Sequence, residues 1–111
     1  MTLLVCTYKI DPKSKNLIFD PLPDNGEELA GFESWRSIVW GSEETINLGV
    51  RFLPKLKETD LYVEGEDLIE FIKECKMLIE HYEDKSIRFR LNNFIKAANK
   101  AILCKGGVLI N

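Results

Sequence analysis

Residues 66–83, EDLIEFIKECKMLIEHYE, and residues 86–104, SIRFRLNNFIKAANKAILC, decide the fold. In both stretches the apolar residues recur at steps of three and four, a spacing that places them on one face of a helix. In the first stretch this face holds Leu68, Phe71, Ile72, Cys75, Leu78, Ile79 and Tyr82. In the second it holds Ile87, Leu91, Phe94, Ile95, Ala98 and Ile102. Each stretch is therefore predicted to be an amphipathic helix.

The joint between the two predicted helices is short. It reads Asp84-Lys85-Ser86, and either Asp84 or Ser86 can cap the second helix. Gly106 follows that helix and is expected to act as its C-terminal stop. A joint of this length makes the two helices fold back on each other as an antiparallel hairpin.

Short segments rich in β-branched and apolar residues lie outside the helices. Residues 3–10 and 17–20 predict a β-hairpin joined by a polar turn, and Pro21 and Pro23 end it. Residues 61–63 are a further strand candidate, and residues 107–110 are expected to pair with the N-terminal hairpin. The predicted fold is α+β, a small, mostly antiparallel sheet with the antiparallel helical hairpin packed on one face. Residues 1–111 are expected to form a single domain.

These elements define an expected hydrophobic core. Its predicted members are the apolar residues on the inner faces of the strands and helices. They are Val5, Phe19, Leu68, Phe71, Ile72, Cys75, Leu78, Ile79, Leu91, Phe94, Ile95, Ala98 and Ile102.

Residues 24–60 have the least regular pattern. With Asp24 as N-cap and Glu27 in the first turn, they predict a helix that ends near Gly41. Residues 35–40 fit a strand equally well. Ser42 is expected to cap another short helical piece, and Pro54 to end or kink whatever precedes it.

Composition excludes several classes of protein. Fifteen basic and eighteen acidic residues give a net charge of −3, too small for a general affinity for nucleic acid or anionic membranes. The apolar N-terminus is short and lacks a basic segment, so neither a signal peptide nor a membrane span is expected, and the predicted location is cytoplasmic. Cys6, Cys75 and Cys104 are too widely spaced for a disulfide framework or a zinc ribbon, and we expect buried, unreactive thiols.

The charged residues are divided between the two predicted helices. Residues 65–84 carry seven acidic and two basic residues, whereas residues 85–105 carry six basic residues and no acidic one. The simplest interpretation is that opposite charges flank the seam between the helices. Alternatively, the basic helix contacts nucleic acid, which the acidic net charge disfavours, or one charged face docks a protein partner. The candidate partner-binding residues of these surfaces are Glu74, Arg88 and Lys96.

A second candidate surface contains Trp35, Arg36 and Trp40. Tryptophan and arginine are the residues most enriched at the energetic centres of protein interfaces. The alternative is that the large aromatic side chains belong to the core of this small domain.

Catalytic and metal-binding patterns are weak. His81 is the only histidine, and Cys75, six residues earlier, lies about 120° away from it around a helix. The acidic turn that contains Glu64 and Asp67 could hold Mg²⁺, but acidic residues are common at helix starts. The sequence contains no phosphate-binding loop or EF-hand, and we assign no catalytic residue, metal ligand or cofactor.

Residues 46–111 carry a resemblance to known proteins. The features are Leu48-Gly49, Phe52-Leu53-Pro54, the run from Asp60 to Gly65, the two helices and the terminal residues 106–110. This layout resembles small uncharacterised bacterial proteins that are similar to immunity proteins of toxin systems. The resemblance implies a protein that binds and neutralises a cognate toxin, and it carries no functional residue over.

The function expected from the sequence is therefore a non-enzymatic protein-binding module, such as a bacterial immunity-type inhibitor. One alternative is a structural or regulatory homodimer that associates through an apolar sheet edge or the region of Trp35 and Trp40. Another is a small enzyme that uses His81 together with the turn at residues 64–67.

Overall fold

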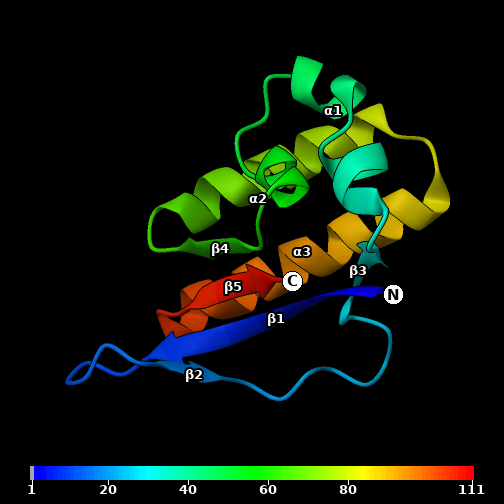
Figure 1. Cartoon of the computed structure of the whole chain (residues 1–111). Helices are drawn as coiled ribbons and strands as arrows, with labels where there is room; N and C mark the ends of the chain where they lie inside the picture. Colours follow the sequence, from blue (N-terminus) through cyan, green and yellow to red (C-terminus); the bar gives the residue numbers. More distant parts are fainter. Residues whose placement is uncertain (1) are drawn as a thin grey trace.

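The structure is a computed structural model in which residues 2–111 are described. It combines five strands, three α-helices and two short helical turns of other types (Figure 1). In chain order these are β1 (Thr2–Ile10), β2 (Leu17–Phe19), β3 (Leu29–Phe32), a π turn (Arg36–Trp40), α1 (Glu43–Asn47), a 3₁₀ helix (Leu53–Lys57), β4 (Leu61–Glu64), α2 (Asp67–His81), α3 (Lys85–Cys104) and β5 (Gly107–Ile110).

All strand pairs of the sheet are antiparallel, and β1 is at its centre. The order is β2-β1-β5-β4, and β3 also pairs with β1. β3 pairs with the start of β1 at residues 2–4, and β2 pairs with its end at residues 8–10. Because β5 takes the other edge of β1, β3 and β2 occupy successive parts of one edge.

The predicted helical hairpin is confirmed. α2 and α3 pack against each other, and α3 lies against β1, β3 and β5 on one face of the sheet (Figure 1). Asp84 caps α3, since its Oδ1 accepts a hydrogen bond from the Ile87 amide at 3.0 Å. At the other end, α3 ends before Gly106 as expected, and the residue with the left-handed backbone at this end is Lys105, with a φ of 55°.

Gly106 is needed for a different reason. A Cβ at this position would overlap the main-chain oxygen of Tyr8, so β5 can approach β1 this closely only with glycine here. We expect Gly106→Ala to lower the free energy of unfolding by about 2 kcal/mol, the cost typical of overpacking a dense interior. Denaturant unfolding measures this change. The neighbouring Lys105→Ala should cost much less, and equal losses for both variants would contradict the steric explanation.

Most of the predicted core is confirmed. Eight of its members are buried in one cluster: Val5, Leu68, Phe71, Cys75, Leu78, Leu91, Phe94 and Ala98. Ile72, Ile79 and Ile95 are partly buried against that cluster. Two predictions were wrong. Phe19 pairs with Tyr8 on the face of the sheet away from the helices, and Ile102 lies in the last turn of α3, where it lines a surface groove.

The helix predicted from Asp24 to Gly41 is wrong over its first part. Residues 29–32 form strand β3, and Gly31 has a φ of 113°, which no helix contains. Asn93 of α3 holds the start of this segment, because its Nδ2 donates to the main-chain oxygens of Gly26 and Leu29. Only the π turn at residues 36–40 is helical, and it ends at Gly41 as expected.

The short helix after Gly41 is confirmed. Ser42 caps α1 by accepting a hydrogen bond from the Thr45 amide at 3.2 Å. Pro54 does not end a helix. It lies in the first turn of the 3₁₀ helix. A backbone N–H in the first turn has no acceptor within the helix, so proline removes no helical hydrogen bond there.

Opposite charges do not pair across the helix–helix seam. Within residues 2–111, no ion pair joins α2 to α3. The basic side chains of α3 extend instead toward the segment after β2, where Lys96 reaches Glu27 at 3.2 Å and Lys100 reaches Asp20 at 3.9 Å. The apolar stripes therefore hold the hairpin together, and the charge asymmetry lies outside the seam.

Candidate functional site: an uncovered apolar sheet face

The register of the sheet sorts its side chains into two faces. In antiparallel strands, directly opposed residues share a face, and the face alternates along each strand. Two opposed rows are buried against the helices. They are Val5, Ile110 and Leu61, and then Thr7, Val108 and Val63.

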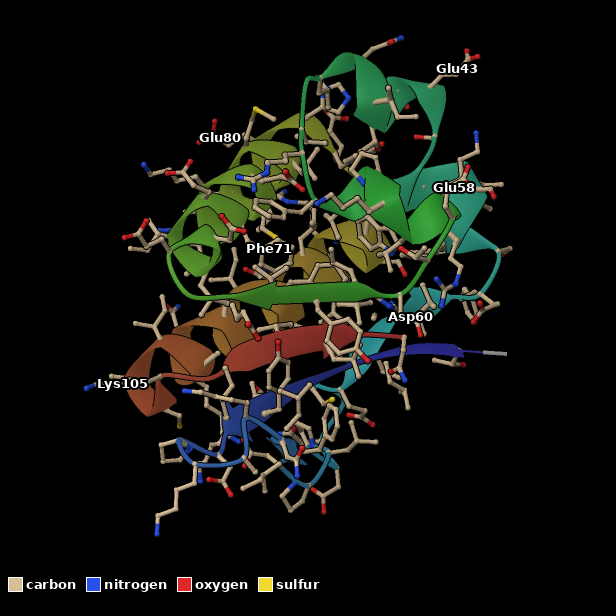
Figure 2. All side chains as sticks on the ribbon, turned by 60° about the vertical axis from the view of Figure 1, so that its left-hand side comes forward. Glu43, Glu58, Asp60, Phe71, Glu80 and Lys105 are labelled. Atoms are coloured by element: carbon tan, nitrogen blue, oxygen red, sulfur yellow. The ribbon has the colours of Figure 1, made fainter. Side chains whose placement is uncertain are left out.

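The intervening rows point away from the helices. One row holds Cys6, Leu109 and Tyr62, and the next holds Phe19, Tyr8, Gly107 and Glu64. We call these seven residues the open face. In Figure 2 strands β4, β5 and β1 lie in front of the helices, and no other element of the chain crosses in front of them.

An aromatic cluster forms the centre of the open face. The ring of Tyr8 lies 5.6 Å from that of Phe19 and 6.2 Å from that of Tyr62, both in edge-to-face geometry. Tyr8 itself is buried, because its ring lies over Gly107, where a Cβ would overlap it. Its two neighbours remain accessible, with 55% of Tyr62 and 49% of Phe19 exposed.

The Tyr8 hydroxyl is fixed by a single strong hydrogen bond. It donates to Oε2 of Glu64 at 2.6 Å. Burial, and then the hydrogen bond to this carboxylate, raise the pKa of Tyr8 well above its ordinary value. Tyr8 therefore stays protonated at physiological pH, which makes it a positioning element of the face and not an ionised nucleophile or base.

A hollow adjoins the aromatic cluster. It has a volume of about 410 Å³ and is lined by Leu4, Cys6, Phe19, Asp20, Leu22, Leu109 and Asn111. Leu22 comes from the segment after β2 and is about half exposed. The hollow is a depression in the open face that can accept an apolar side chain of a binding partner.

This arrangement is suited to binding. A sheet covered on one side normally alternates apolar residues inside with polar residues outside. Here the outer rows are apolar except for Glu64, whose carboxylate is already held by Tyr8. Exposed apolar patches of this kind mark interaction sites in soluble proteins.

Two of the sequence-predicted partner-binding residues are buried. Trp40 is fully enclosed, and its Nε1 donates to the main-chain oxygen of Ala30 at 3.0 Å. Glu74 is also buried, although the sequence predicted it to lie on a charged surface that could meet a partner. Its carboxylate accepts hydrogen bonds from the amides of Arg51, Phe52 and Leu53 at 2.6 to 2.9 Å. Neither side chain can meet a partner in this fold.

Arg36 is occupied inside the molecule. Its guanidinium donates to the main-chain oxygens of Leu56 and Thr59 at 3.1 and 2.9 Å. It also pairs with Asp60 at 2.7 Å and Glu33 at 2.5 Å. All these contacts tie the π turn to the segment before β4, so the structure gives Arg36 a structural role.

The remaining three predicted residues are accessible but do not form one surface with the open face. Trp35 is half-buried between Phe32 and Trp40, with the Arg90 guanidinium 5.3 Å from its ring. Arg88 and Lys96 are exposed on α3, on the helix-covered side of the sheet.

The structure separates the groups that the enzyme alternative would need to combine. His81 ends α2, whereas Glu64 and Asp67 lie at its start, about 20 Å away at 1.5 Å per residue. His81 forms an exposed pair with Glu44, with 2.6 Å between Nε2 and Oε2. Cys75 is fully buried, and burial followed by the nearby Glu74 carboxylate raises the pKa of its thiol.

Two further kinds of site are absent from residues 2–111. No three histidine, cysteine or acidic side chains converge in a way that could hold a metal ion. In the same part of the chain, each helix is too short or too polar to cross a membrane.

Sequence reasoning missed the open face and the role of Glu74, although both left a signal. Strand β1 is apolar on both sides, with Leu3 and Val5 on one and Leu4, Cys6 and Tyr8 on the other. A strand of this kind requires cover on both faces, yet the chain supplies one layer of helices. Glu74 falls within the apolar stripe of α2, three residues after Phe71.

Comparison with protein-family models, with curated proteins and with solved structures found no match. We therefore base the proposed function on the open face and its hollow.

Proposed function

We propose that the chain is a non-enzymatic protein-binding module that docks a folded protein partner on the open face. The observation that carries this proposal is the exposed pair Tyr62 and Phe19, which flank the buried Tyr8 on a sheet surface that no helix covers. Burial of the exposed halves of Tyr62 and Phe19 would contribute about 2 kcal/mol each, at about 25 cal/mol per Å².

The negative charge at the open face indicates the chemistry of the partner surface. Glu64 is exposed beside the aromatic cluster, and the whole chain carries a net charge of −3. A complementary partner has an apolar centre and a rim of lysine or arginine, which would also accelerate association. An immunity-type inhibitor, which would cover a surface of a toxin, is one protein of this kind.

The open face can be tested with variants that leave the core intact. We expect Tyr62→Asp and Phe19→Asp each to weaken partner binding by about thirtyfold, because each places a charge in the desolvated centre of the interface. Tagged full-length chains are used to capture the partner from cells of the source organism, and the affinity of each variant for it is then measured by calorimetry. Leu103→Asp is the matched control, since Leu103 is 85% exposed on α3.

The control decides how the result is interpreted. Loss of binding in the two open-face variants with retention in Leu103→Asp supports the proposal. Retention of the partner by Tyr62→Asp at wild-type affinity contradicts it, provided that thermal unfolding shows the variant to be folded.

A homodimer is the second candidate, because the same apolar face can pair with its copy about a two-fold axis. Light scattering at micromolar concentration separates the two. In a homodimer formed through the open face, Tyr62→Asp would convert a dimer into a monomer and Leu103→Asp would not. If the wild-type chain is monomeric at this concentration, the homodimer is excluded.

A further inference from the structure

One edge of β1 contains a gap between β2 and β3. On the β2 side, the Asp20 amide donates to the main-chain oxygen of Thr7 at 3.0 Å. On the β3 side, the Val5 amide donates to the main-chain oxygen of Glu28 at 2.9 Å. The chain between these points, residues 21–27, leaves the edge, and Pro21 and Pro23 keep it from continuing β2.

The gap leaves two main-chain groups of β1 without a neighbouring strand, although Val5 and Thr7 are themselves buried. Main-chain groups alternate between the two edges of a strand, and Leu4 bonds Asn111 on the β5 edge in both directions, at 2.8 and 3.0 Å. Val5 and Thr7 therefore direct their groups to the opposite edge. Val5 and Thr7 are paired with neither β2 nor β3, and outside the strand pairs of residues 2–111 the Val5 oxygen and the Thr7 amide form no hydrogen bond.

A cavity of about 200 Å³ lies at this gap. It is lined by Val5, Cys6, Thr7, Pro21, Pro23, Glu27, Asn93, Lys96, Ala97 and Lys100. Cys6 lines both this cavity and the hollow on the open face. Because its side chain lies on the open face, its main chain must border the cavity. The cavity is thus walled by the unpaired edge of β1 on one side and by α3 on the other.

Polar groups of both signs converge on this cavity. Asn93 is 2% exposed, and its Nδ2 donates to Gly26 and Leu29, which leaves its Oδ1 without a hydrogen-bond partner in the described chain. Lys96 and Lys100 also line the cavity. Lys96 is 3.2 Å from Glu27, and Lys100 is 3.9 Å from Asp20.

We infer that this cavity binds a small molecule that carries a carboxylate and an N–H donor, namely an α-amino acid or the carboxyl-terminal residue of a peptide. Its carboxylate accepts from the Thr7 amide and pairs with Lys96 and Lys100. Its nitrogen donates to the Val5 oxygen and to Oδ1 of Asn93. The cavity is smaller than the 300–1,000 Å³ typical of sites for drug-sized ligands, which fits a ligand of about one residue.

The inference does not depend on the proposed function. The cavity opens at the edge of β1 beside α3, whereas the docking surface is the open face. The Tyr62→Asp variant should therefore bind the small ligand as the wild type does.

Titration of the ¹⁵N-labelled full chain tests the inference. The probes are each proteinogenic amino acid, followed by tripeptides with a free or an amidated carboxyl terminus. We expect a saturable shift of the Thr7 amide resonance with at least one amino acid or free-carboxyl tripeptide, and no such shift with the amidated peptide. We compare the affinities of the free amino acid and the free-carboxyl tripeptide. The tighter of these two probes identifies the ligand as an amino acid or as the end of a peptide.

Variants of the exposed lysines complete the test. The double variant Lys96→Gln with Lys100→Gln should weaken binding by about tenfold or more. Lys85→Gln, on the same helix but outside the cavity, should leave it unchanged. The inference is overturned by absence of a saturable Thr7 shift with every probe at millimolar concentration. Equal affinity in the double variant and the wild type overturns it as well.

Discussion

Replacing Glu74 with alanine is expected to lower the free energy of unfolding by about 4 kcal/mol. The change removes one carboxylate and leaves the amides of Arg51, Phe52 and Leu53 without an acceptor. A buried donor left unpaired costs its full desolvation energy, which is why the loss exceeds that of an ordinary hydrogen bond. At this chain length the midpoint of thermal unfolding should fall by about 15 °C.

The matched control for Glu74 lies on the same helix. Glu80 is exposed, and its replacement by alanine should change stability by less than about 0.5 kcal/mol (Figure 2). Glu74→Gln keeps one oxygen acceptor and should lose about half as much stability as Glu74→Ala. Chemical unfolding of the three variants measures these differences. If Glu74→Ala and Glu80→Ala are equally stable, the carboxylate does not hold residues 51–53.

Replacing Trp40 with alanine is also expected to cost about 4 kcal/mol. The ring is fully buried, 5.7 Å from the ring of Trp35 and 5.2 Å from that of Phe94, and its Nε1 is bonded to Ala30. The change leaves a cavity between the π turn and α3 and also leaves the Ala30 oxygen without its donor. Urea unfolding, with tryptophan fluorescence of the remaining Trp35 as one probe, gives the loss directly.

Trp35 provides the comparison for Trp40. It is only half-buried, so Trp35→Ala should cost clearly less than Trp40→Ala. A Trp40→Ala variant that unfolds at the wild-type denaturant concentration would place Trp40 outside the core. Trp40→Phe fills most of the space and isolates the contribution of the Nε1 hydrogen bond, which is about 1 kcal/mol.

The long helices and their hairpin could be predicted because their signal is redundant. In α2 and α3 the apolar residues repeat over several turns, so single exceptions such as Ile102 do not change the assignment. The short joint at Asp84 then leaves one way to connect them. Strand β5 was predictable for a related reason, since Val108, Leu109 and Ile110 form an apolar run that needs a buried place in the sheet.

Short strands contain too few residues for their pattern to predict their position with the same certainty as the long helices. β2 has three residues, and a shift of one residue in its pairing would exchange its two faces. The position of Phe19 therefore depends on its register with Tyr8, which the local sequence does not encode. β3 was missed because Leu29 and Phe32 also fit a helical spacing, and the left-handed backbone at Gly31 excludes that helix only once the structure is known.

Three of the candidate binding residues have contacts inside the fold that their residue types did not reveal. Glu74, Arg36 and Trp40 are chemically suited to an interface, but each forms its hydrogen bonds with other residues of the chain. Pairing between distant segments decided this outcome, because Glu74 bonds residues more than twenty positions earlier. The open face arises in the same way, from the registry of β1, β5 and β4.

Site-specific photo-cross-linking tests the docking role of the open face most directly. A photoreactive amino acid is placed at Tyr62 on the open face, and in a second chain at Met77, which is exposed on α2. Irradiation in cells of the source organism should join the chain labelled at position 62 to one protein in high yield and leave the chain labelled at position 77 without that product. A partner captured at position 77 and not at position 62 would contradict the assignment of the open face as the docking surface.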